Sequence, residues 1–593
     1  MRSLALSFCS ALLLTSLCFG SQEKGQPEIV AIPPADGGRG LIRVNAQEIR
    51  HYSGNRKAPD YLVSKDNGKT WKLQQAPDSY PPNFGGIPKE SPDIERNPIT
   101  KEFIRVQPIG GFVFLSQGGL DGTWSAVTKD GKLEKDWKDA EKRKNLLTLR
   151  GIMRSPLFVN KGKRIIIPTH EMGKGTWFHI SDDGGLTWKP SKDTITSPQF
   201  EVKPPEQGSR WYNNGVEASV VELANGTLYS LVRTSMDQHY ESFSKDFGNT
   251  WTKSQPSRFF GTLTMPTLGK LDNGTLVALW TNARPLPENK KAGNGKWEDV
   301  FTNRDTIHIA LSNTNGKTWY GFREILLEEH RNKGDFATMN GPEDRGKHQS
   351  QFVQLDKNKI LVSLGQHPCH RKLVIVDTGW VGEKTRATQV GKHPEEWTTH
   401  TYIPQVKGHC SYNRKASCEL VPAPDTDSKK VLQIKRLNAP ELVNTEANVD
   451  YQNGGATWNF PNGTTGALKF KFRIANGDQA KDSGLHISLM DRLFNACDTN
   501  APDNAIFSFP IVINPSPHLV INGKKIPFAP QTWHQMSIVW VNNQASISLD
   551  GKPVGKLQQH QKTPNGISYI HFISTATQPD SGVLLDDVAV KVK

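Results

Sequence analysis

Cysteine is scarce in this sequence. The chain has 593 residues and six cysteines, and two of the six, Cys9 and Cys18, lie within the first twenty residues. The four that remain are too few for a domain held together by disulfide bonds. The fold must therefore rest on hydrophobic cores, and a chain of this length favours two or more domains.

Long apolar runs are missing after the first twenty residues. A membrane-spanning helix needs about 20 consecutive apolar residues, and no later stretch approaches this length, so we predict no membrane span. The start of the chain differs, because Arg2 is followed by an apolar run over residues 4–17 and by small residues near Gly20. This pattern is typical of a secretory signal peptide. We predict a signal peptide over residues 1–20 and a secreted or periplasmic protein.

Dense basic runs are also absent, although the formal net charge is +14. The lysines and arginines are spread along the chain without a nucleic-acid-binding motif, so no nucleic acid partner is predicted. Scattered positive charge is consistent with a solvated surface that attracts anionic glycans. The alternative is that the protein is simply a basic exported protein with no such partner. The cluster His367-Pro-Cys369-His370 has no second Cys/His pair at zinc spacing, so we expect no metal and no cofactor.

A repeated octet organises the first two thirds of the chain. Its pattern is Ser-x-Asp-x-Gly-x-Thr-Trp, and it occurs at residues 64–71, 181–188, 244–251 and, with Thr314 in place of the aspartate, 312–319. Asp and Gly suit a tight turn, because the carboxylate accepts backbone hydrogen bonds and glycine adopts dihedrals closed to other residues. We interpret the octet as a structural turn with no catalytic role.

The repeat predicts six units. Degenerate copies at 128–137 and 372–380 complete the series, and hairpins with Asn-Gly turns precede two octets, at 220–232 and 268–279. Units of roughly 50 to 70 residues have the size of a four-stranded propeller blade. We therefore predict an all-β chain whose residues 21–405 form a six-bladed β-propeller.

The texture of the sequence changes after Trp380. Residues 466–473 alternate between apolar and polar side chains, and residues 533–554 predict a hairpin by alternation and turn chemistry. We predict a jelly-roll β-sandwich over residues 406–593. In pattern this segment resembles the concanavalin A-like lectin domains.

The octets, together with the segment from Val216 to Arg233, resemble the Asp-box (BNR) repeats of the sialidase, or neuraminidase, superfamily. The resemblance covers residues 27–380. In that family a glutamate that opens a blade assists a tyrosine nucleophile, and an arginine at the end of the next strand joins a triad that binds the substrate carboxylate. Glu217 and Arg233 match these two positions. Arg304 matches the arginine that precedes the next Asp-box strand.

The residue types suit an acidic sugar independently of the resemblance. Guanidinium groups bind a carboxylate through paired, planar hydrogen bonds, and a nearby glutamate can stay ionised and polarise a hydroxyl group. The alternative is that Arg233, Arg304 and Glu217 are rim residues paired with local charges. The functional interpretation requires both arginines to converge with Glu217 around one pocket on the propeller axis.

The third arginine of the triad departs from the family pattern. The first blade reads Ala31-Ile32-Pro33 where the family has an arginine before Ile-Pro. Arg154 is our candidate to replace it, and Arg43 and Arg50 remain open as alternatives.

The family's nucleophilic tyrosine is also missing. The corresponding segment is Gly346-Lys-His348-Gln349-Ser350, and a glutamine cannot form a covalent glycosyl intermediate. His348 is a candidate base, and Tyr212 or Tyr240 could approach the axis from neighbouring loops, Tyr240 as a substrate-binding residue. Asp60 is the nearest candidate for the acid/base aspartate that the resemblance implies in the first blade.

Three functions fit these observations. The first is an exo-glycosidase that acts as a monomer on acidic glycans or polysaccharides and releases a terminal acidic sugar such as sialic acid. The second is a polysaccharide lyase acting on uronic acids, with His170, His239, Tyr240 or His348 as the base. The third is a propeller that only binds glycans, which the missing tyrosine favours.

Overall fold

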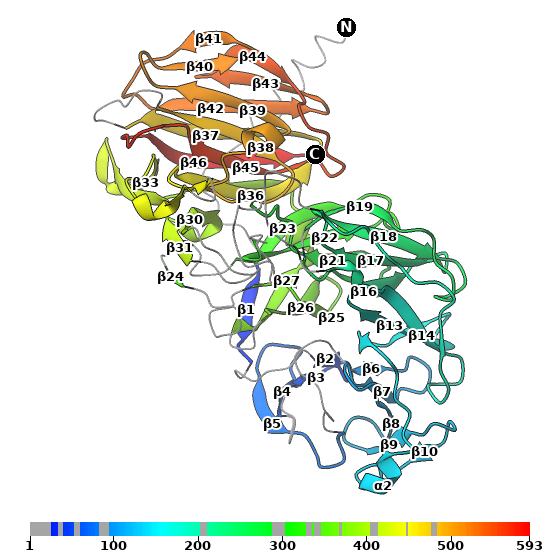
Figure 1. Ribbon diagram of the computed structural model, residues 1–593. Helices are drawn as coiled ribbons and strands as arrows, with labels where there is room; N and C mark the ends of the chain where they lie inside the picture. The colour runs from blue at the N-terminus through cyan, green and yellow to red at the C-terminus, as the bar shows by residue number, and fades with distance from the viewer. Residues whose placement is uncertain are drawn as a thin grey trace.

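The computed structural model is almost entirely β-structure (Figure 1). It describes residues 25–33, 40–52, 60–81, 94–201, 210, 212–261, 263–286, 303–327, 332, 335–336, 346–366, 370–403, 413–445, 449–475 and 483–593. The predicted signal peptide, residues 1–20, lies outside the described residues. Within these ranges, none of the helices has the length and apolar character needed to cross a membrane.

Six antiparallel sheets form the blades of a propeller, as predicted. The first two blades contain β2 (Gly40–Arg43), β3 (Ile49–Tyr52), β4 (Asp60–Ser64) and β5 (Lys72–Gln75), then β6 (Ile94–Arg96), β7 (Phe103–Val106), β8 (Val113–Gln117), β9 (Thr123–Val127) and β10 (Leu133–Glu134). The third contains β11 (Ile152–Met153), β12 (Leu157–Val159), β13 (Arg164–Glu171), β14 (Gly175–Ser181) and β15 (Lys189–Pro190).

The other three blades have four strands each. The fourth contains β16 (Asn214–Glu222), β17 (Leu228–Thr234), β18 (Gln238–Ser244) and β19 (Gln255–Phe260), and the fifth contains β20 (Thr267–Lys270), β21 (Leu276–Trp280), β22 (Thr306–Ser312) and β23 (Tyr320–Leu327). The sixth contains β25 (Gln351–Gln354), β26 (Lys359–Leu364), β27 (Lys372–Asp377) and the N-terminal strand β1 (Glu28–Ala31), which pairs with β27. This pairing closes the ring between the two ends of the propeller sequence.

The octets form the turns that their composition predicts. In the fourth blade, Asp246 Oδ1 accepts hydrogen bonds from Ser244 Oγ (2.9 Å) and from the backbone N–H of Thr250 (2.9 Å). Gly248 has a φ of 95°, which favours glycine, and its carbonyl accepts a hydrogen bond from Trp251 Nε1 (3.0 Å). The hydrogen bonds of Asp246 and Trp251 within the octet therefore hold it as a structural turn.

The octets also define the two ends of the propeller. Each of the four octets follows the third strand of its blade, so the Asp-box turns share one end, which we call the box end. The inner strands begin, and the second strands finish, at the opposite end. We call this the site end, because the candidate residues described below lie there.

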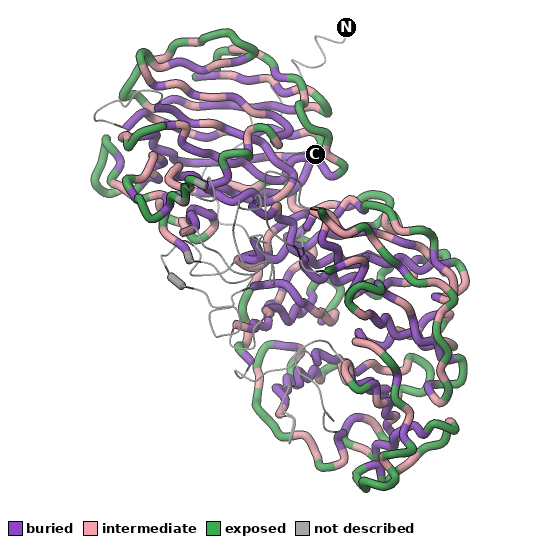
Figure 2. Tube along the Cα trace, in the orientation of Figure 1, coloured by how far each residue is buried: buried purple, intermediate pink, exposed green. Residues whose placement is uncertain are grey.

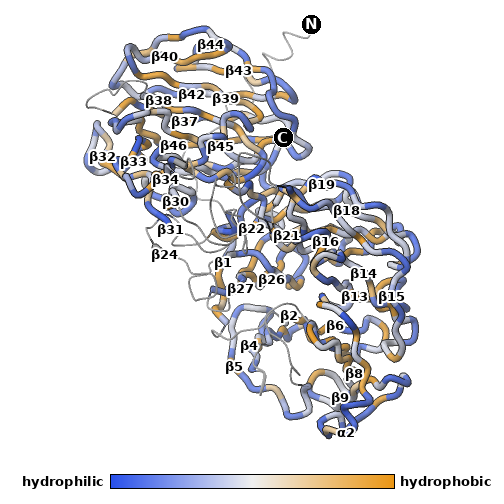
Figure 3. Tube along the Cα trace, viewed as in Figure 1, coloured by the Kyte–Doolittle hydropathy of each residue, from blue (hydrophilic) through white to orange (hydrophobic). Residues whose placement is uncertain are grey.

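Hydrophobic side chains pack between neighbouring blades. One cluster joins Ile166 and Phe178 of the third blade to Val220, Leu228 and other residues of the fourth. Figures 2 and 3 show buried and hydrophobic residues along the strands, and exposed, hydrophilic residues at many of the connecting loops. Blade contact thus buries the apolar faces that the alternating sequence provides.

The C-terminal part is a β-sandwich. One sheet contains β32 (Cys418–Ala423), β33 (Thr426–Ile434), β46 (Val583–Val592), β37 (Thr465–Ile474), β42 (His534–Val541), β43 (Gln544–Leu549) and β44 (Lys552–Gln558), with β28 (Thr385–Thr388) beside β46. The other contains β29 (Trp397–Thr398), β36 (Gly455–Gly463), β45 (Ile567–Ser574), β38 (Gly484–Met490), β39 (Phe507–Val512), β40 (His518–Ile521) and β41 (Lys524–Pro527). One large hydrophobic cluster fills the space between the sheets. The predicted fold class is confirmed, and the likeness to concanavalin A-like domains stays a prediction.

The remaining elements are short. They are the strands β24 (Asp335–Phe336), β30 (His400–Ile403), β31 (Asn413–Ala416), β34 (Val443–Asn444) and β35 (Val449–Asp450), and the helices α2 (Ala140–Arg143), α3 (Thr378–Val381), η2 (Pro394–Glu396), η3 (Pro440–Leu442) and η4 (Pro502–Asn504). Strands β24, β31 and β30 form one small sheet between the two domains, which we call the connector sheet.

The structure differs from the predicted division at residue 405. Strands β28 and β29 precede that residue, yet they pair with β46 and β36 of the sandwich. The propeller therefore ends near α3, and the sandwich begins before the connector sheet. The segment is short in apolar residues, so its sequence reads as a linker, and only its pairing with distant strands reveals where it belongs.

The seven-stranded sheet packs directly against the fifth blade (Figure 1). Asn459 of β36 donates a hydrogen bond to the carbonyl of Phe322 (3.0 Å), and Tyr569 of β45 donates to Glu324 Oε1 (2.7 Å). Ala283 lies in one apolar cluster with Tyr569 and five other sandwich residues. The two domains thus share a packed, hydrogen-bonded interface.

The Asp-box turn yields a stability prediction. We expect Asp246→Ala to lower the free energy of unfolding by about 1–3 kcal/mol, because several hydrogen bonds converge on this carboxylate. Urea denaturation checks this, with the exposed neighbour variant Lys245→Ala as control, which should stay within about 0.5 kcal/mol of wild type.

The same carboxylate predicts a pH dependence. Burial opposes the ionisation of Asp246, but hydrogen bonds from Thr250 and Ser244 outweigh it and lower the pKa. A group whose pKa is lower in the folded state stabilises the fold above its unfolded pKa, and this contribution is lost as the pH falls through the folded pKa. The difference between wild type and Asp246→Ala should therefore shrink below about pH 4. An undiminished difference at pH 2 would contradict this account.

Candidate functional site

Glu217 occupies an irregular position in the inner strand of the fourth blade. Val216 pairs with Arg233, and the next pair along the strand is Ser219 with Leu231. Two residues of β16 but only one of β17 lie between these pairs, so the register of the two strands shifts at this point. Glu217 itself has a φ of 48°. Such a φ is uncommon for a residue other than glycine, and local irregularities of this kind re-aim side chains next to functional sites. The strained backbone of Glu217 therefore points to a role beyond packing.

Glu217 is paired with Arg233, which is the pairing with a local charge that the sequence left open as the alternative to substrate binding. Arg233 Nη1 donates a hydrogen bond to Glu217 Oε2 (2.9 Å), and the side chains are 7% and 15% exposed. Burial opposes the ionisation of Glu217, but the positive charges of Arg233 and Arg154 lower its pKa to about 2. Glu217 is therefore ionised throughout the physiological pH range.

Arg154, the candidate for the third arginine, lies in this same cluster. It is buried, and its Nη1 donates to the thioether Sδ of Met265 in the fifth blade. Arg43 and Arg50 do not come near it. Arg43 finishes β2 at the box end, where its Nη1 donates to Asn67 Oδ1 (3.0 Å), and Arg50 lies one residue from the box end of β3. Of the three alternatives, the structure brings only Arg154 to Glu217.

His170 completes the group around Glu217. It lies near the site end of β13 and is buried. Burial lowers the pKa of His170 to about 4, which the negative charge of Glu217 opposes and the positive charges of Arg154 and Arg233 reinforce. At neutral pH the cluster therefore holds a neutral imidazole beside an ionised carboxylate.

Arg304 is buried between the fifth and sixth blades, 1% exposed. Its Nη1 lies 3.3 Å from His348 Nε2 and 3.3 Å from Gln366 Oε1, and its Nη2 donates to the carbonyl of Leu263. His348 also contacts Gln366. The candidate base His348 thus lies directly against a candidate carboxylate-binding arginine.

Two of the three arginines contact one short segment, residues 263–265. Arg154 contacts the side chain of Met265, and Arg304 contacts the carbonyl of Leu263. The backbone N–H of Leu263 donates to the carbonyl of Thr234 (3.1 Å), the residue that follows Arg233. This segment therefore links the Arg304 region to the Glu217 cluster, and a single pocket shared by all three arginines stays a prediction.

Two further residues belong to this region and were missed by the sequence analysis. Gln366 contacts both Arg304 and His348, and Arg371 is buried below Gln349, with its Nη1 3.1 Å from Ser363 Oγ and 3.5 Å from the carbonyl of Gln349. Gln349 has a φ of 66°. Neither Gln366 nor Arg371 lies in a motif, so no local signal could have singled them out.

Asp60 and Tyr240 are not joined to the cluster. Asp60 begins β4 at the site end and pairs with Gln75, and it makes no hydrogen bond or ion pair with the described residues of the cluster. The ring of Tyr240 belongs to the hydrophobic cluster between the third and fourth blades, together with Ala218 and Val232. Strand alternation directs Tyr240 into this core, so a substrate-binding role is not supported by its position.

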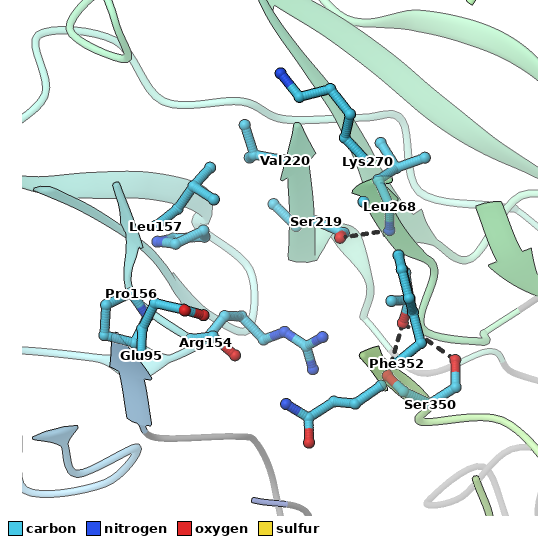
Figure 4. Close-up of a pocket in the computed structure, with 16 residues that line it drawn as sticks. Glu95, Arg154, Pro156, Leu157, Ser219, Val220, Leu268, Lys270, Ser350 and Phe352 are labelled. Carbon is cyan, nitrogen blue, oxygen red and sulfur yellow. Dashed lines mark hydrogen bonds between the residues drawn. The ribbon is translucent and has the colours of Figure 1, made fainter. Parts of the chain in front are cut away.

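A cavity of about 270 Å³ lies beside Arg154. It runs along the inner strands of the third to sixth blades, and Glu95 of the second blade also lines it. Figure 4 shows the guanidinium group of Arg154 directed into the cavity, between Glu95 on one side and Ser350 and Phe352 on the other. Burial raises the pKa of Glu95 to about 7, against a backbone hydrogen bond that lowers it. Arg154 is the one candidate arginine among the described residues that line this cavity.

A metal centre has no visible basis in the part of the chain that the structure describes. No group of three or more His, Cys, Asp or Glu side chains in these ranges is arranged to hold an ion. His367 and Cys369 lie outside the described residues. Neither finding bears on the identity of a substrate.

Comparison with known proteins gives one family match. Residues 112–363 match the family described as BNR repeat-like domain. This part of the chain includes Glu217, Arg233, Arg304 and His348, and it agrees with the observed Asp-box turns. No curated protein matches the sequence.

Solved structures show only a weak likeness. A sialidase from Trypanosoma rangeli is 13% identical over 97% of this chain and 96% of its own, with a TM-score of 0.33. A protein of unknown function from Dyadobacter fermentans is 19% identical over 60% of this chain and 98% of its own, with a TM-score of 0.38. At these scores the likeness carries no argument, and the fold rests on the sheets described above.

The electrostatics of the cluster predict the behaviour of His170. We expect its imidazole to stay neutral between pH 5 and 8, because burial and two neighbouring guanidinium groups disfavour a second proton. An NMR titration of the histidine ring protons, assigned with a His170→Asn variant, measures this directly. A midpoint above pH 6 for His170 would show that the cluster is more solvated or less positive than its geometry implies.

Proposed function

We propose that this chain is an exported, sialidase-like exo-glycosidase that releases a terminal acidic sugar from glycans. The observation that supports the proposal is the buried group of Glu217, Arg233 and Arg154, together with Arg304, which contacts the same 263–265 segment as Arg154. Each arginine comes from a different blade, and each is at most 7% exposed. Buried guanidinium groups form strong, oriented hydrogen bonds with a carboxylate, so a sugar acid is the ligand class that fits them.

The residues suggest a hydrolytic route that needs no covalent intermediate. Gln349 stands where the resemblance implies a tyrosine, so water must attack the anomeric carbon directly. Neutral His170 can accept the proton of that water, and Asp60 is the proposed acid that protonates the departing glycosidic oxygen. Ionised Glu217 then holds Arg233 and the water or imidazole in place. This assignment of roles extends the geometry and is part of the proposal.

Product analysis tests the proposed activity. Incubation with sialyllactose should release free sialic acid, measured by chromatography, while a uronate polymer should give no ultraviolet-absorbing unsaturated product. Binding of the sialoside without any release would instead support the non-catalytic glycan-binding function. Absence of both binding and release would remove sialic acid from the proposal.

Arg154 offers a sharper test of carboxylate binding. We expect Arg154→Lys to weaken the binding of the acidic sugar by about tenfold or more, because lysine cannot form the paired, planar hydrogen bonds of a guanidinium group. Arg164→Lys is the matched control, since Arg164 lies in the same blade but pairs with Asp182 at the box end (2.6 Å). Isothermal titration calorimetry of both variants makes the comparison. Equal affinities would argue against a role for Arg154.

A lyase acting on uronic acids is the second candidate, and neutral His170 beside Arg154 favours it. In β-elimination a base removes the proton from the carbon next to the carboxylate, the C–O bond to the leaving sugar on the following carbon breaks as a C=C bond forms, and water protonates the leaving oxygen, while arginines neutralise the developing charge on the carboxylate. His170 has the protonation state for that step at neutral pH. Formation of an unsaturated product that His170→Asn abolishes would establish the lyase and displace the glycosidase.

A further inference from the structure

The sandwich is attached to the blade that carries Arg304. Arg304 lies two residues before β22, and Asp305, which directly precedes the strand, is 1% exposed. Side chains of adjacent residues in an extended segment point to opposite sides. Arg304 reaches toward His348 and Gln366 at the axis, whereas Asp305 reaches away from it toward the connector sheet.

Asp305 is held by residues that belong to the C-terminal part of the chain. Arg414 of β31 donates from Nη2 to Asp305 Oδ1 (2.6 Å), and both side chains are 1% exposed. His400 of β30 lies 3.4 Å from Asp305 Oδ2 and contacts Tyr402. Arg414 therefore forms a fully buried ion pair with Asp305, the neighbour of Arg304. The two partners are more than a hundred residues apart in the sequence.

The connector sheet is in turn fastened to the sandwich. Ser417, which follows β31, donates from Oγ to the carbonyl of Gly455 in β36 (3.2 Å), and Thr401 of β30 donates to the carbonyl of Tyr451 (2.7 Å). Tyr402 donates to Asn495 Oδ1 (3.1 Å). The position of Arg414 is thus set by the sandwich.

A second buried chain of hydrogen bonds fixes the same strand. The backbone N–H of Asn282 donates to His308 Nδ1 (3.0 Å), so the proton of the neutral ring lies on Nε2, which contacts Tyr569 Oη. Tyr569 donates to Glu324 Oε1 (2.7 Å). Both the start and the middle of β22 are therefore anchored to the sandwich.

We propose that Arg414 is a positioning residue for Arg304: by holding Asp305 from the connector sheet, it makes the C-terminal sandwich part of the carboxylate-binding site. The role of Arg304 as a carboxylate ligand rests on the proposed function, whereas its placement by Arg414 does not. The sandwich then serves the site as a rigid support, because the face it turns to the propeller is buried and hydrogen-bonded.

The test compares three variants of the full chain. Removing Arg414 alone leaves the buried Asp305 without the Arg414 contact and endangers folding. The main variant is therefore Asp305→Asn with Arg414→Gln, which keeps polar side chains at both positions and removes both charges. Arg414→Lys keeps the charge and loses the paired, planar donors of the guanidinium group. Arg436→Gln is the control, since it removes a more exposed ion pair, Arg436 with Asp450 (2.6 Å), that does not touch the Arg304 segment.

Structure is the first readout. Crystal structures of the double variant and of Arg414→Lys should show Arg304 withdrawn from Gln366 Oε1 and His348 Nε2, while Arg436→Gln leaves it in place. If Arg304 keeps both contacts in the double variant and in Arg414→Lys, the positioning role is overturned, whatever the protein is found to do.

Ligand selectivity is the second readout. For a sialic acid glycoside, the double variant should bind the free acid about tenfold more weakly than wild type and bind its methyl ester equally well, with Arg414→Lys in between. An equal loss for acid and ester would indicate general damage and contradict the proposal. If wild type binds neither ligand, the proposed function fails, and the crystallographic result still decides the role of Arg414.

Discussion

The burial of several guanidinium groups around a single ionised carboxylate is the interaction on which the site depends. Charges buried away from water are costly unless they are paired. Glu217 is paired with Arg233, and the positive charge of Arg154 also acts on it. Burial, reinforced by the positive charges of Arg154 and Arg233, keeps His170 neutral. Two arginines around one carboxylate leave the cluster with excess positive charge, which an acidic ligand would balance.

That arrangement needs a rigid frame, because an arginine contributes to binding only if its direction is maintained. The propeller supplies part of the frame, since the short segment at residues 263–265 contacts both Arg154 and Arg304. The sandwich supplies the rest through the ion pair of Asp305 and Arg414 and the chain from His308 to Tyr569. The two domains act as one structural unit around the fifth blade.

Local sequence patterns were enough to predict the propeller blades and their turns. The octets are turns whose geometry is decided within eight residues, so Asp246 and its hydrogen bonds could be predicted without knowing the rest of the chain. Glu217, Arg233 and Arg304 were singled out because their positions match those that the resemblance to the sialidase superfamily implies. Tyr240 shows the limit of this reasoning, because being near the site in sequence does not say which face of β18 a side chain occupies.

By itself, the sequence determined the all-β composition, the six repeats and a change of sequence character after Trp380, because these depend on periodicity and turn chemistry within short windows. Only the tertiary structure decided that Arg154 and not Arg43 joins Glu217, that β28 and β29 belong to the sandwich, and that Arg414 holds Asp305. Each of these depends on contacts between residues far apart in the chain, and such contacts arise from the closure of the propeller ring and the docking of the sandwich, which no local pattern encodes.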